Sequence, residues 1–480
     1  MIARPADAAM DAEVLVIGSG AGGATTAAVL AEAGIDVLVV EEGEWVEQGD
    51  TVPFSLDQMD RQYRAGGVTV ALGLPSVAYT EGRCAGGGTE VNSGLYWRPP
   101  GELLARWRED FRIADFDPAE LLSIADEVET VLHVGTDPAG PTAPSEAMRR
   151  GADALGWRNG EIPRWMRHDG SGAGQRQSMT RTYLPRAAAS GARIVTGCRV
   201  DRLELDGDRA VAAHTTLPDG RTGRITFRDV FVCGGAIQSP ALLQRSGIRG
   251  NIGRSLAVHP TVKLAARFAY PLNIPDDVPV HQVKEFAPHL SFGGSASNPG
   301  LVALSLLDEW NGFRDAVVDW PRISVYYAAI TSQGRGRVFS VPRLRDPIVT
   351  YHLTARDRAL LRSGLGRLAL LMLEAGADTV FPSFRGAPAV RTRKHVATME
   401  RLFSANRASV MTVHLCSTVP IGEEAARCGA DSFGRVHGAT NIHVNDASLL
   451  PTAPGVNPQA TVMAFAIRNA RRFAAGESHG

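Results

Sequence analysis

The chain has 480 residues, 44% of them hydrophobic, so it can bury a large core and form two structural units. Its formal net charge of −1 excludes an electrostatic case for nucleic acid or an anionic membrane as partner. Five scattered cysteines without zinc spacing indicate a reducing cytoplasm and no metal site, and neither a secretory signal in residues 1–13 nor an uncharged membrane-spanning run is expected.

The first predicted elements are a strand, a glycine-rich turn, a helix and a second strand. Val14–Ile17 is predicted as a short buried strand, and Ala24–Ala33 as a helix of small residues. Ile35–Val40 follows as an apolar strand that ends at Glu41. The turn in residues 18–23 has the spacing Gly-x-Gly-x-x-Gly, which in this frame predicts a dinucleotide site.

Each part of this turn has a physical role. Gly18 lets the chain turn off the strand, Gly20 lets backbone amides approach a pyrophosphate, and Gly23 lets the helix pack on the sheet. The helix N-terminus faces the phosphate charge, and Glu41 can accept hydrogen bonds from a ribose diol. The carboxylate favours FAD or NAD over NADP. A tight turn without a ligand is the alternative interpretation.

Later elements fall into two groups. A second α/β block and a region of half-buried alternating strands follow, and their predicted strands are Arg193–Val195, Val200–Leu205, Ala210–Thr215, Arg224–Val232, Val262–Phe268, Ile323–Ala328 and Arg337–Val341. Asp219 and Gly220 predict a turn, and Asp357–Ala375 predicts an amphipathic helix that ends at Gly376.

This order predicts an α/β fold with a discontinuous nucleotide-binding domain and an inserted second domain. The first is expected to be Rossmann-like and to comprise residues 1–100, 190–262 and 403–480. The second, in residues 101–189 and 263–402, is expected to be an α+β substrate-binding domain and cap built on an antiparallel sheet.

Four motifs in order carry a resemblance to a known family. They are GSGAGG with Glu41, GRCAGGGTEVNSG in residues 82–94, GGAIQSPALLQRSGI in residues 234–248, and VNDASLLPTAPGVNPQATVMAFAIR in residues 444–468. Together they span nearly the whole chain. The chain resembles the glucose–methanol–choline (GMC) family of FAD-dependent oxidoreductases.

The resemblance implies a set of residues around FAD. The second motif looks like the family's glycine-rich loop beside the flavin, with Asn92 as a hydrogen-bond donor. The helix after Pro458 is expected to point its N-terminus at the flavin, where its amides stabilise negative charge. The expected cofactor contacts are Gly18, Gly20, Ala21, Gly22, Gly23, Glu41, Glu42, Gly87, Gly88, Thr89, Asn92, Val200, Gly234, Asp446, Ala447, Pro458 and Thr461.

Two residues are expected to carry the chemistry. HLCSTVPIG resembles the family's His-Pro-x-Gly-Thr segment, although Leu415 and Ser417 depart from it, and this implies His414 as general base. The family's second polar position corresponds to Asn457, which is expected to hold the substrate hydroxyl. A buried structural histidine and a helix-capping asparagine are the alternatives.

Three further residues bear on the cofactor and the pocket. Some relatives attach FAD covalently through a histidine just before the loop asparagine. Position 91 is Val91, so non-covalent FAD is expected. Trp97 and His259 are expected to lie at the substrate pocket, with plain packing as the alternative for both.

The resemblance implies oxidation of a CH–OH group to a carbonyl by hydride transfer to flavin N5. The expected partners are a small-molecule alcohol and oxygen or another electron acceptor, for a monomer or small homo-oligomer. A sugar or aminoglycoside hydroxyl in secondary metabolism, such as antibiotic biosynthesis, is the first substrate hypothesis. Asp308, Glu309 and Asp319 are its candidate carboxylates, and surface exposure is the alternative. The competing hypotheses are a sterol or fatty alcohol as substrate, a non-redox lyase on the same scaffold, and a non-enzymatic flavoprotein.

Overall fold

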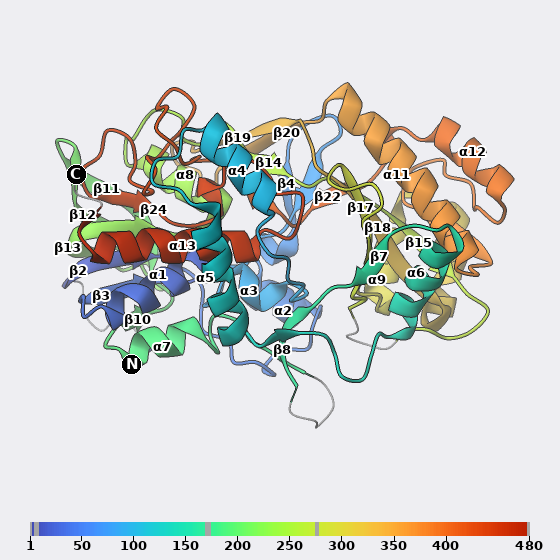
Figure 1. The fold of residues 1–480 in the computed structure, drawn as a ribbon, viewed down its shortest axis with the longest axis horizontal. Helices are drawn as coiled ribbons and strands as arrows, with labels where there is room; N and C mark the ends of the chain where they lie inside the picture. Colours follow the sequence, from blue (N-terminus) through green and yellow to red (C-terminus); the bar gives the residue numbers. More distant parts are fainter. Residues whose placement is uncertain (1, 4–8, 169–173, 274–277, 478–480) are drawn as a thin grey trace.

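An eight-stranded sheet organises one half of the molecule in the computed structural model, which describes residues 2–3, 9–168, 174–273 and 278–477 (Figure 1). The strand order is β1-β10-β3-β2-β13-β12-β11, and β24 pairs with β13. Strands β1 to β13 in this order are parallel, and β12 and β11 continue as antiparallel neighbours. The bounds are β1 Ile2–Ala3, β2 Ala9–Ile17, β3 Val37–Val40, β10 Arg193–Val195, β11 Arg199–Asp206, β12 Arg209–Thr216, β13 Thr222–Val232 and β24 Ile442–Val444.

Helices cover this sheet and bring distant segments together. Helix α1 (Ala21–Glu32) packs against α7 (Tyr183–Ala189) and against the last helix, α13 (Gln459–Ala474). Helix α13 also packs on α5 (Pro118–Val131), and α8 (Gly235–Arg245) packs on β11. Because β3 is buried along its whole length, a continuous Val-Leu-Val-Val run suits it.

A nine-stranded, mainly antiparallel sheet organises the other half. Its order is β4-β5-β22-β15-β18-β17-β16-β7, and β21 pairs with β15. The bounds are β4 Thr69–Ala71, β5 Val77–Tyr79, β7 Asn159–Glu161, β15 Thr261–Arg267, β16 His281–Val283, β17 Leu290–Ser295, β18 Ile323–Ile330, β21 Thr379–Pro382 and β22 Val410–Thr412.

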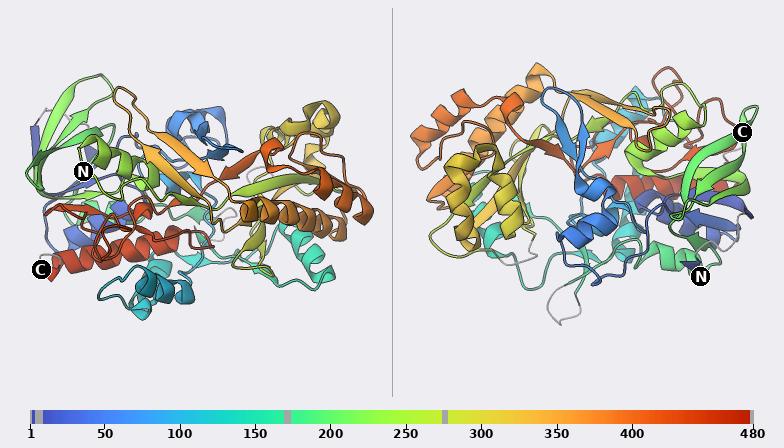
Figure 2. Two further views of the ribbon diagram at one scale, coloured as in Figure 1. Left: turned by 90° about the horizontal axis from the view of Figure 1, so that it is seen from above. Right: turned by 180° about the vertical axis from the view of Figure 1, so that it is seen from behind.

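One long helix supports this sheet. Helix α11 (Ala355–Glu374) packs on β15 and β18, with α6 (Ala143–Ala154) and α12 (Arg393–Leu402) beside it. A capping box between Thr354 and Asp357 starts α11, and Gly376, with a φ of 93°, follows its end. The two halves lie side by side in all ribbon views (Figure 2).

The remaining elements are short. They are the helices α2 Leu56–Gln62, α3 Gly88–Val91, α4 Gly101–Asp110, α9 Pro299–Ser305 and α10 Trp310–Phe313, five 3-10 turns, and three small sheets made of β14 Ala257–Val258 with β23 Leu415–Cys416, β19 Arg335–Phe339 with β20 Ile348–His352, and β6 Val134–Gly135, β8 Arg164–Arg167 and β9 Gln175–Arg176.

The predicted elements agree well with this structure, and the α/β fold class is confirmed. All the predicted strands are present within a few residues, and the first helix begins at Ala21, before the expected Ala24. The sheets differ from the expected domain limits in one respect. Strands β4, β5 and β22 lie in the segments expected to belong to the nucleotide-binding domain, yet they extend the second sheet.

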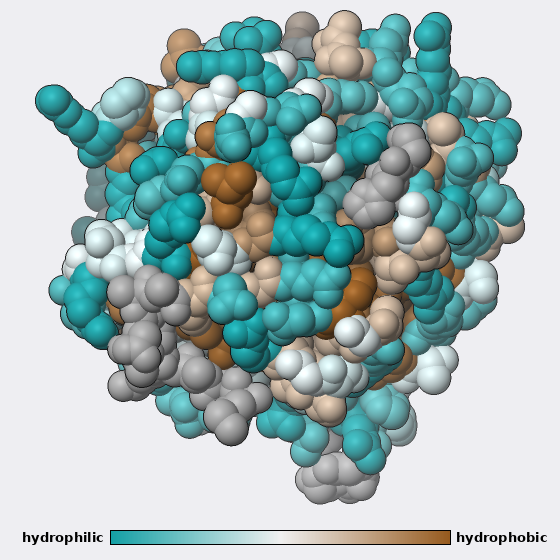
Figure 3. All heavy atoms as spheres, turned by 90° about the vertical axis from the view of Figure 1, so that its left-hand side faces the viewer, coloured by the Kyte–Doolittle hydropathy of each residue, from teal (hydrophilic) through white to brown (hydrophobic). Residues whose placement is uncertain are grey.

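The surface gives no sign of a membrane-spanning segment. Within the described ranges, no helix is both long enough and apolar enough to cross a bilayer. The face shown in Figure 3 is mainly hydrophilic, with small scattered apolar patches. No group of three or more metal-ligating side chains occurs in the described part of the chain.

Candidate active site

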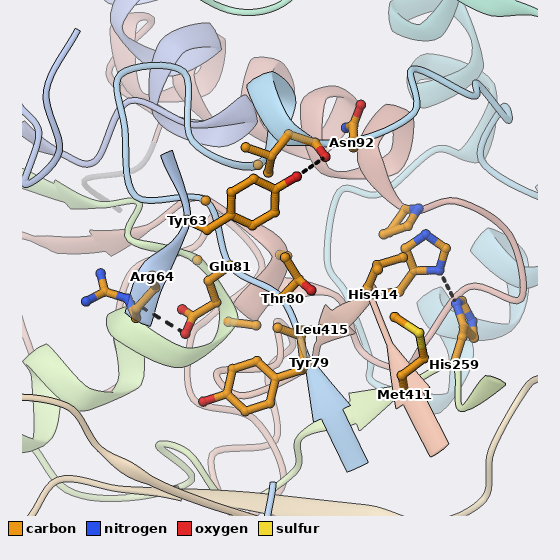
Figure 4. A pocket seen from close by; sticks show the side chains of 18 of the residues that line it. Tyr63, Arg64, Tyr79, Thr80, Glu81, Asn92, His259, Met411, His414 and Leu415 are labelled. Atoms are coloured by element: carbon orange, nitrogen blue, oxygen red, sulfur yellow. Dashed lines mark hydrogen bonds and ion pairs between the residues drawn. The ribbon is translucent and has the colours of Figure 1, made fainter. Parts of the chain in front are cut away.

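A large cavity of about 1250 Å³ is lined by residues of both sheets (Figure 4). One end is formed by the glycine-rich turn, Glu41 and the start of α8. The other end is formed by the strands β15 to β18 and by His414 and Asn457. The cavity therefore joins a nucleotide-like end to a second end with ionisable side chains.

Glycines at the nucleotide end are required by close backbone contacts. A Cβ at Gly18, which has a φ of 100°, would lie 2.4 Å from the Cys233 carbonyl oxygen, and one at Gly23 would lie 1.9 Å from that of Gly18. At Gly20 a Cβ would meet only Gly87, at 3.9 Å. Bare backbone therefore faces the cavity at the start of α1, where amide groups and the helix dipole favour a phosphate.

Two consecutive carboxylates, Glu41 and Glu42, directly follow strand β3, and their environments differ. Glu41 accepts hydrogen bonds from Ser19 N at 3.0 Å, Ser19 Oγ at 2.7 Å and Gly43 N at 2.8 Å, while burial raises its pKa. Glu42 pairs with Arg64 at 2.7 Å and Arg345 at 2.9 Å. Burial alone would raise the pKa of Glu42, but these guanidinium groups outweigh it and lower the pKa to about 2.

The glycine-rich loop also lines the cavity, through Gly87, Gly88, Thr89 and Asn92. The Asn92 side chain donates to Gln459 Oε1 at 2.8 Å and accepts from Gly94 N at 2.8 Å. Asn92 therefore joins this loop to the start of α13.

Asp446 fastens the start of α8 to the C-terminal segment. Its carboxylate accepts hydrogen bonds from Gly235 N at 2.7 Å, Ser239 Oγ at 2.5 Å and Ser448 N at 2.7 Å. Other expected contacts that line the cavity are Ala21, Gly22, Val200, Gly234, Ala447 and Pro458.

Three expected residues lie away from the cavity wall. Gly23 lies against the Gly18 carbonyl inside the turn. Thr461 is fully buried in α13, and its Oγ1 atom has no hydrogen-bond partner among the described residues. Trp97 lies behind the wall, where its indole N–H donates to Gln282 Oε1 at 3.1 Å. Gln282 itself lines the cavity.

His414 and His259 were both expected at the pocket, but the sequence did not predict that their side chains contact each other at the second end. Nδ1 of His414 lies 2.9 Å from Nδ1 of His259, and the rings meet edge to face. Nε2 of His414 lies 3.4 Å from Nδ2 of Asn457. Nε2 of His259 accepts a hydrogen bond from Gly455 N at 2.9 Å. The loop of residues 455–457 therefore contacts both imidazoles.

The backbone donor determines the hydrogen positions on both rings. Because Gly455 donates to Nε2 of His259, neutral His259 carries its hydrogen on Nδ1 and donates it to Nδ1 of His414. Neutral His414 then carries its hydrogen on Nε2, facing Asn457. Base catalysis at Nε2 needs the opposite tautomer, in which His414 donates from Nδ1 and His259 carries its hydrogen on Nε2.

Burial keeps both imidazoles neutral. Burial, and then the charge of Lys284, lower the pKa of His414 to about 4. Burial, His414 and Lys284 hold the pKa of His259 well below its ordinary value. Neutral imidazole is the form that can accept a proton.

The candidate carboxylates for an amino-sugar substrate lie outside the cavity lining. Asp308 accepts from the Ser409 amide at 2.9 Å, Glu309 accepts from Gly386 N at 2.6 Å, and Asp319 lies 3.6 Å from Arg267. Each has a partner in the protein.

Comparisons with known proteins agree with this geometry. Residues 59–261 and 332–466 match the two family models described as GMC oxidoreductase, and residues 11–49 match an FAD binding domain. The chain belongs to the GMC oxidoreductase family. As a GMC protein it is an FAD-dependent oxidoreductase that acts on alcohols. The bare glycine backbone, the N-terminus of α1 and Glu41 fit the phosphates and ribose of FAD.

Similar proteins cover nearly the whole of this GMC chain. An uncharacterised GMC-type oxidoreductase of Sinorhizobium fredii is 38% identical over 96% of this chain and 94% of its own length. Long-chain-alcohol oxidase FAO3 of Arabidopsis thaliana is 26% identical (97% and 69%), and paromamine 6'-oxidase of Streptomyces fradiae is 28% identical (96% and 91%). The crystal structure of pyridoxine 4-oxidase from Mesorbium loti superposes with a TM-score of 0.73 at 20% identity, covering 96% of this chain and 99% of that one.

Proposed function

We propose that this chain oxidises its alcohol with His414 as the group that takes up the hydroxyl proton. The observation that carries the proposal is a neutral, buried imidazole that lines the FAD cavity beside Asn457. Bound FAD supplies the hydride acceptor at flavin N5. A positioned general base is expected to contribute about 10²–10⁴-fold to the rate.

His259 and Gly455 set the condition for that step. For Nε2 of His414 to accept the proton, His414 must donate from Nδ1 to His259, and His259 must carry its hydrogen on Nε2. The Gly455 amide opposes this tautomer because it donates to the same nitrogen. We assign His259 as the positioning residue of His414. A shift of the 455–457 loop away from His259 would remove the Gly455 contact and let Nε2 of His414 act as the base.

Asn457 is proposed to hold the substrate oxygen. Its amide is within reach of Nε2 of His414, so an oxygen bound between them would contact both side chains. Orientation of the hydroxyl fixes where its C–H bond points, which is a positional contribution to catalysis. Pro458 follows and begins the turn into α13.

FAD is proposed to be held without a covalent bond. Val91 stands where covalent relatives have the linking histidine, and Val91 lines the cavity. Its carbonyl accepts a hydrogen bond from the Tyr63 hydroxyl at 3.3 Å. The lining histidines, His259 and His414, are hydrogen-bonded to each other. The cytoplasmic location, the monomeric or small homo-oligomeric state and the electron acceptor stay predictions.

For the substrate, a polar sugar-like alcohol is the first proposal. It rests on the polar groups of the second end of the cavity and on the likeness to paromamine 6'-oxidase. A fatty alcohol is the second candidate, because five exposed apolar side chains line the cavity: Val68, Val70, Leu74, Leu304 and Val413. The likeness to a long-chain-alcohol oxidase agrees with this candidate.

The experiment is an anaerobic alcohol screen of the holoenzyme. An oxidised alcohol bleaches the yellow flavin, and admission of air then shows whether peroxide forms. A substrate converted without bleaching would instead identify a lyase. His414→Ala is expected to slow bleaching by about 10²–10⁴-fold while it retains FAD. His289→Ala, at an exposed histidine, is the matched control and should leave the rate unchanged.

A further inference from the structure

Two of the chain's three lysines lie in the cavity of this enzyme. Lys263 and Lys284 line its second end, and the third, Lys394, is exposed on α12. All ion pairs between described residues use arginine or histidine as the cation. The two cavity lysines therefore take no part in the structural ion pairing of the molecule.

Strand register places one lysine in a row of polar side chains. Lys263 on β15 is the direct neighbour of Tyr327 on β18, Tyr327 is opposite Gly293 on β17, and Gly293 is opposite Gln282 on β16. A Cβ at Gly293 would lie 2.4 Å from the Tyr327 hydroxyl, so the bare glycine leaves room for the phenol to reach Gln282.

Lys284 directly follows the end of β16 and, like Gln282, faces the cavity. We call Lys263, Tyr327, Gln282 and Lys284 the lysine row. All four side chains line the cavity.

A chain of hydrogen bonds leaves the Tyr327 hydroxyl free to donate. The Trp97 indole can only donate, so its 3.1 Å contact fixes the Gln282 carbonyl oxygen toward it. The Gln282 amide nitrogen then donates to the Tyr327 oxygen at 3.3 Å. The hydrogen of that hydroxyl remains available to an acceptor in the cavity. Three donors, two of them cationic, are thus held on one wall.

No acidic group balances these cations. Among the described residues, neither ammonium group has a hydrogen-bond or ion-pair partner, although Lys284 lies 4.7 Å from the centre of the Trp97 ring. Burial is the cause that lowers the pKa of each lysine to about 8, so both remain mainly charged at neutral pH.

The acidic side chains that line the cavity are Glu41, Glu42, Glu81 and Asp446, and each is bound by protein groups at the other end. Lys263 and Lys284 are half-buried, and a cation withdrawn from water without a partner is costly, so an anion that enters the cavity reduces that cost. The charge of Lys284 also lowers the pKa of His414, so the lysine row lies near the proposed base.

We propose that the lysine row binds an anionic group of the substrate, a carboxylate or a phosphate, and that the oxidised alcohol therefore carries negative charge. The inference rests on the proposed oxidation at His414. It narrows the substrate class proposed above from polar alcohols to acidic ones, because two unpaired cations repel an aminoglycoside and attract an acid.

The test has a binding arm that needs no turnover. The holoenzyme is titrated calorimetrically with inorganic phosphate and with acetate, which separates the two anion classes. At least one is expected to bind, and Lys263→Met and Lys284→Met should each weaken it about tenfold or more. Lys394→Met is the matched control and should leave binding unchanged. FAD content and melting temperature report folding, and Lys263→Gln and Lys284→Gln replace any methionine variant that fails to fold.

The kinetic arm compares 4-(hydroxymethyl)benzoate and 4-(hydroxymethyl)phenyl phosphate with the neutral 4-(hydroxymethyl)benzamide as flavin-bleaching substrates. An anionic alcohol should have the higher kcat/KM, and the lysine variants should lower the ratio of the anionic to the amide kcat/KM toward one, whereas Lys394→Met should leave that ratio unchanged. Equal preference in wild type and in the double variant overturns the inference, as does anion binding that survives in the double variant. An equal loss of rate with all three alcohols, with a shifted flavin potential, would assign the lysines to the cofactor instead.

Failure of the proposed function gives a different pattern. If anions bind through the lysines but no alcohol in the wider screen bleaches the flavin, the oxidation proposal fails and the anion site stands. If neutral alcohols bleach the flavin and anionic ones neither bind nor react, the oxidation proposal stands and the anion site fails.

Discussion

Backbone atoms control the chemistry of His414 through its neighbour. Gly455 N, at 2.9 Å, makes Nε2 of His259 an acceptor, and this places the lone pair of His414 toward His259. The orientation of the Asn457 amide favours the other tautomer, because its nitrogen faces Nε2 of His414 at 3.4 Å. The side-chain amide can turn over and the backbone amide cannot, so the Gly455 contact decides the resting state.

Replacement of His259 separates the two tautomers. In His259→Asn the amide oxygen takes the place of Nδ1 and accepts from Nδ1 of His414, while nothing remains for Gly455 to oppose. We expect kcat to be equal to or above that of the wild type. In His259→Ala the imidazole loses its neighbour, and kcat should fall about tenfold or more with FAD content unchanged. Steady-state kinetics with one alcohol measure kcat for the two variants and for the wild type. Equal losses in the two variants would contradict the tautomer assignment.

The pH profile follows from the same charges. Since the pKa of His414 is lowered to about 4, its neutral form is present above that value and is lost as pH falls through it. The rate with a neutral alcohol should therefore be flat from about pH 5 to neutrality. The lysines, with a pKa of about 8, lose their charge as pH rises, so kcat/KM for an anionic alcohol should fall above that pH. The other ionisable groups beside the two lysines are His259, whose pKa Lys284 lowers, and Tyr327, which is the strand neighbour of Lys263.

Lys263→Met combined with Lys284→Met gives the control for this profile. The double variant should lose the fall in kcat/KM at high pH, and its fall at low pH should move upward, because Lys284 no longer lowers the pKa of His414. The ordinary pKa of histidine is about 6.5. If the wild-type rate with a neutral alcohol halved near that pH, the pKa of His414 would not be lowered.

At the scale of elements, helix α1 and the last segment of the chain lock together around glycines. A Cβ at Gly22 would lie 2.0 Å from the Asn445 carbonyl oxygen and 2.9 Å from Asp446 Cα. Asn445 in turn donates to Thr26 Oγ1 at 2.8 Å and to the Ala466 carbonyl at 3.0 Å. The segments before β3 and after β24 thus share one tight contact beside the cavity.

Gly22→Ala should open that contact. The clash is with backbone, which can yield only if α1 moves away from the C-terminal segment, so the phosphate end of the cavity should lose its shape. We expect a lower melting temperature and a protein purified with little FAD. Gly160→Ala on β7 is the matched control, because a Cβ there meets nothing within 4 Å. Normal FAD content in Gly22→Ala would contradict this account of the turn.

At the scale of the molecule, local patterns predicted the nucleotide half better than the second half. The turn after β2, Glu41 and the strands of the first sheet follow from spacing and polarity that act over a few residues. The pairing of His259 with His414, which are 155 residues apart, depends on how two sheets meet. The lysine row needs the register of β15 to β18, which the sequence does not reveal.

The same limit explains two of the three expected residues that lie off the cavity wall. Thr461 lies in the first turn of α13, and helix rotation turns it into the core. Trp97 follows the glycine-rich loop closely, yet its ring supports Gln282 from behind. In both cases the motif predicted the neighbourhood, and the direction of the side chain came from packing.

Removal of FAD tests the arrangement of the whole molecule, because the cavity takes its wall from both halves. With Val91 at the expected attachment position, acid or concentrated guanidinium should release all the flavin from the chain, and a filter should retain colourless protein. A ligand at about 100 times its Kd stabilises the folded state by about 2.7 kcal/mol, so the apoprotein should melt at a lower temperature than the holoenzyme. Added FAD should restore both colour and melting temperature, whereas FMN, which lacks the adenosine that Glu41 is expected to bind, should restore less. Yellow colour retained on the unfolded chain would refute non-covalent binding, and equal rescue by FMN would refute the adenosine site.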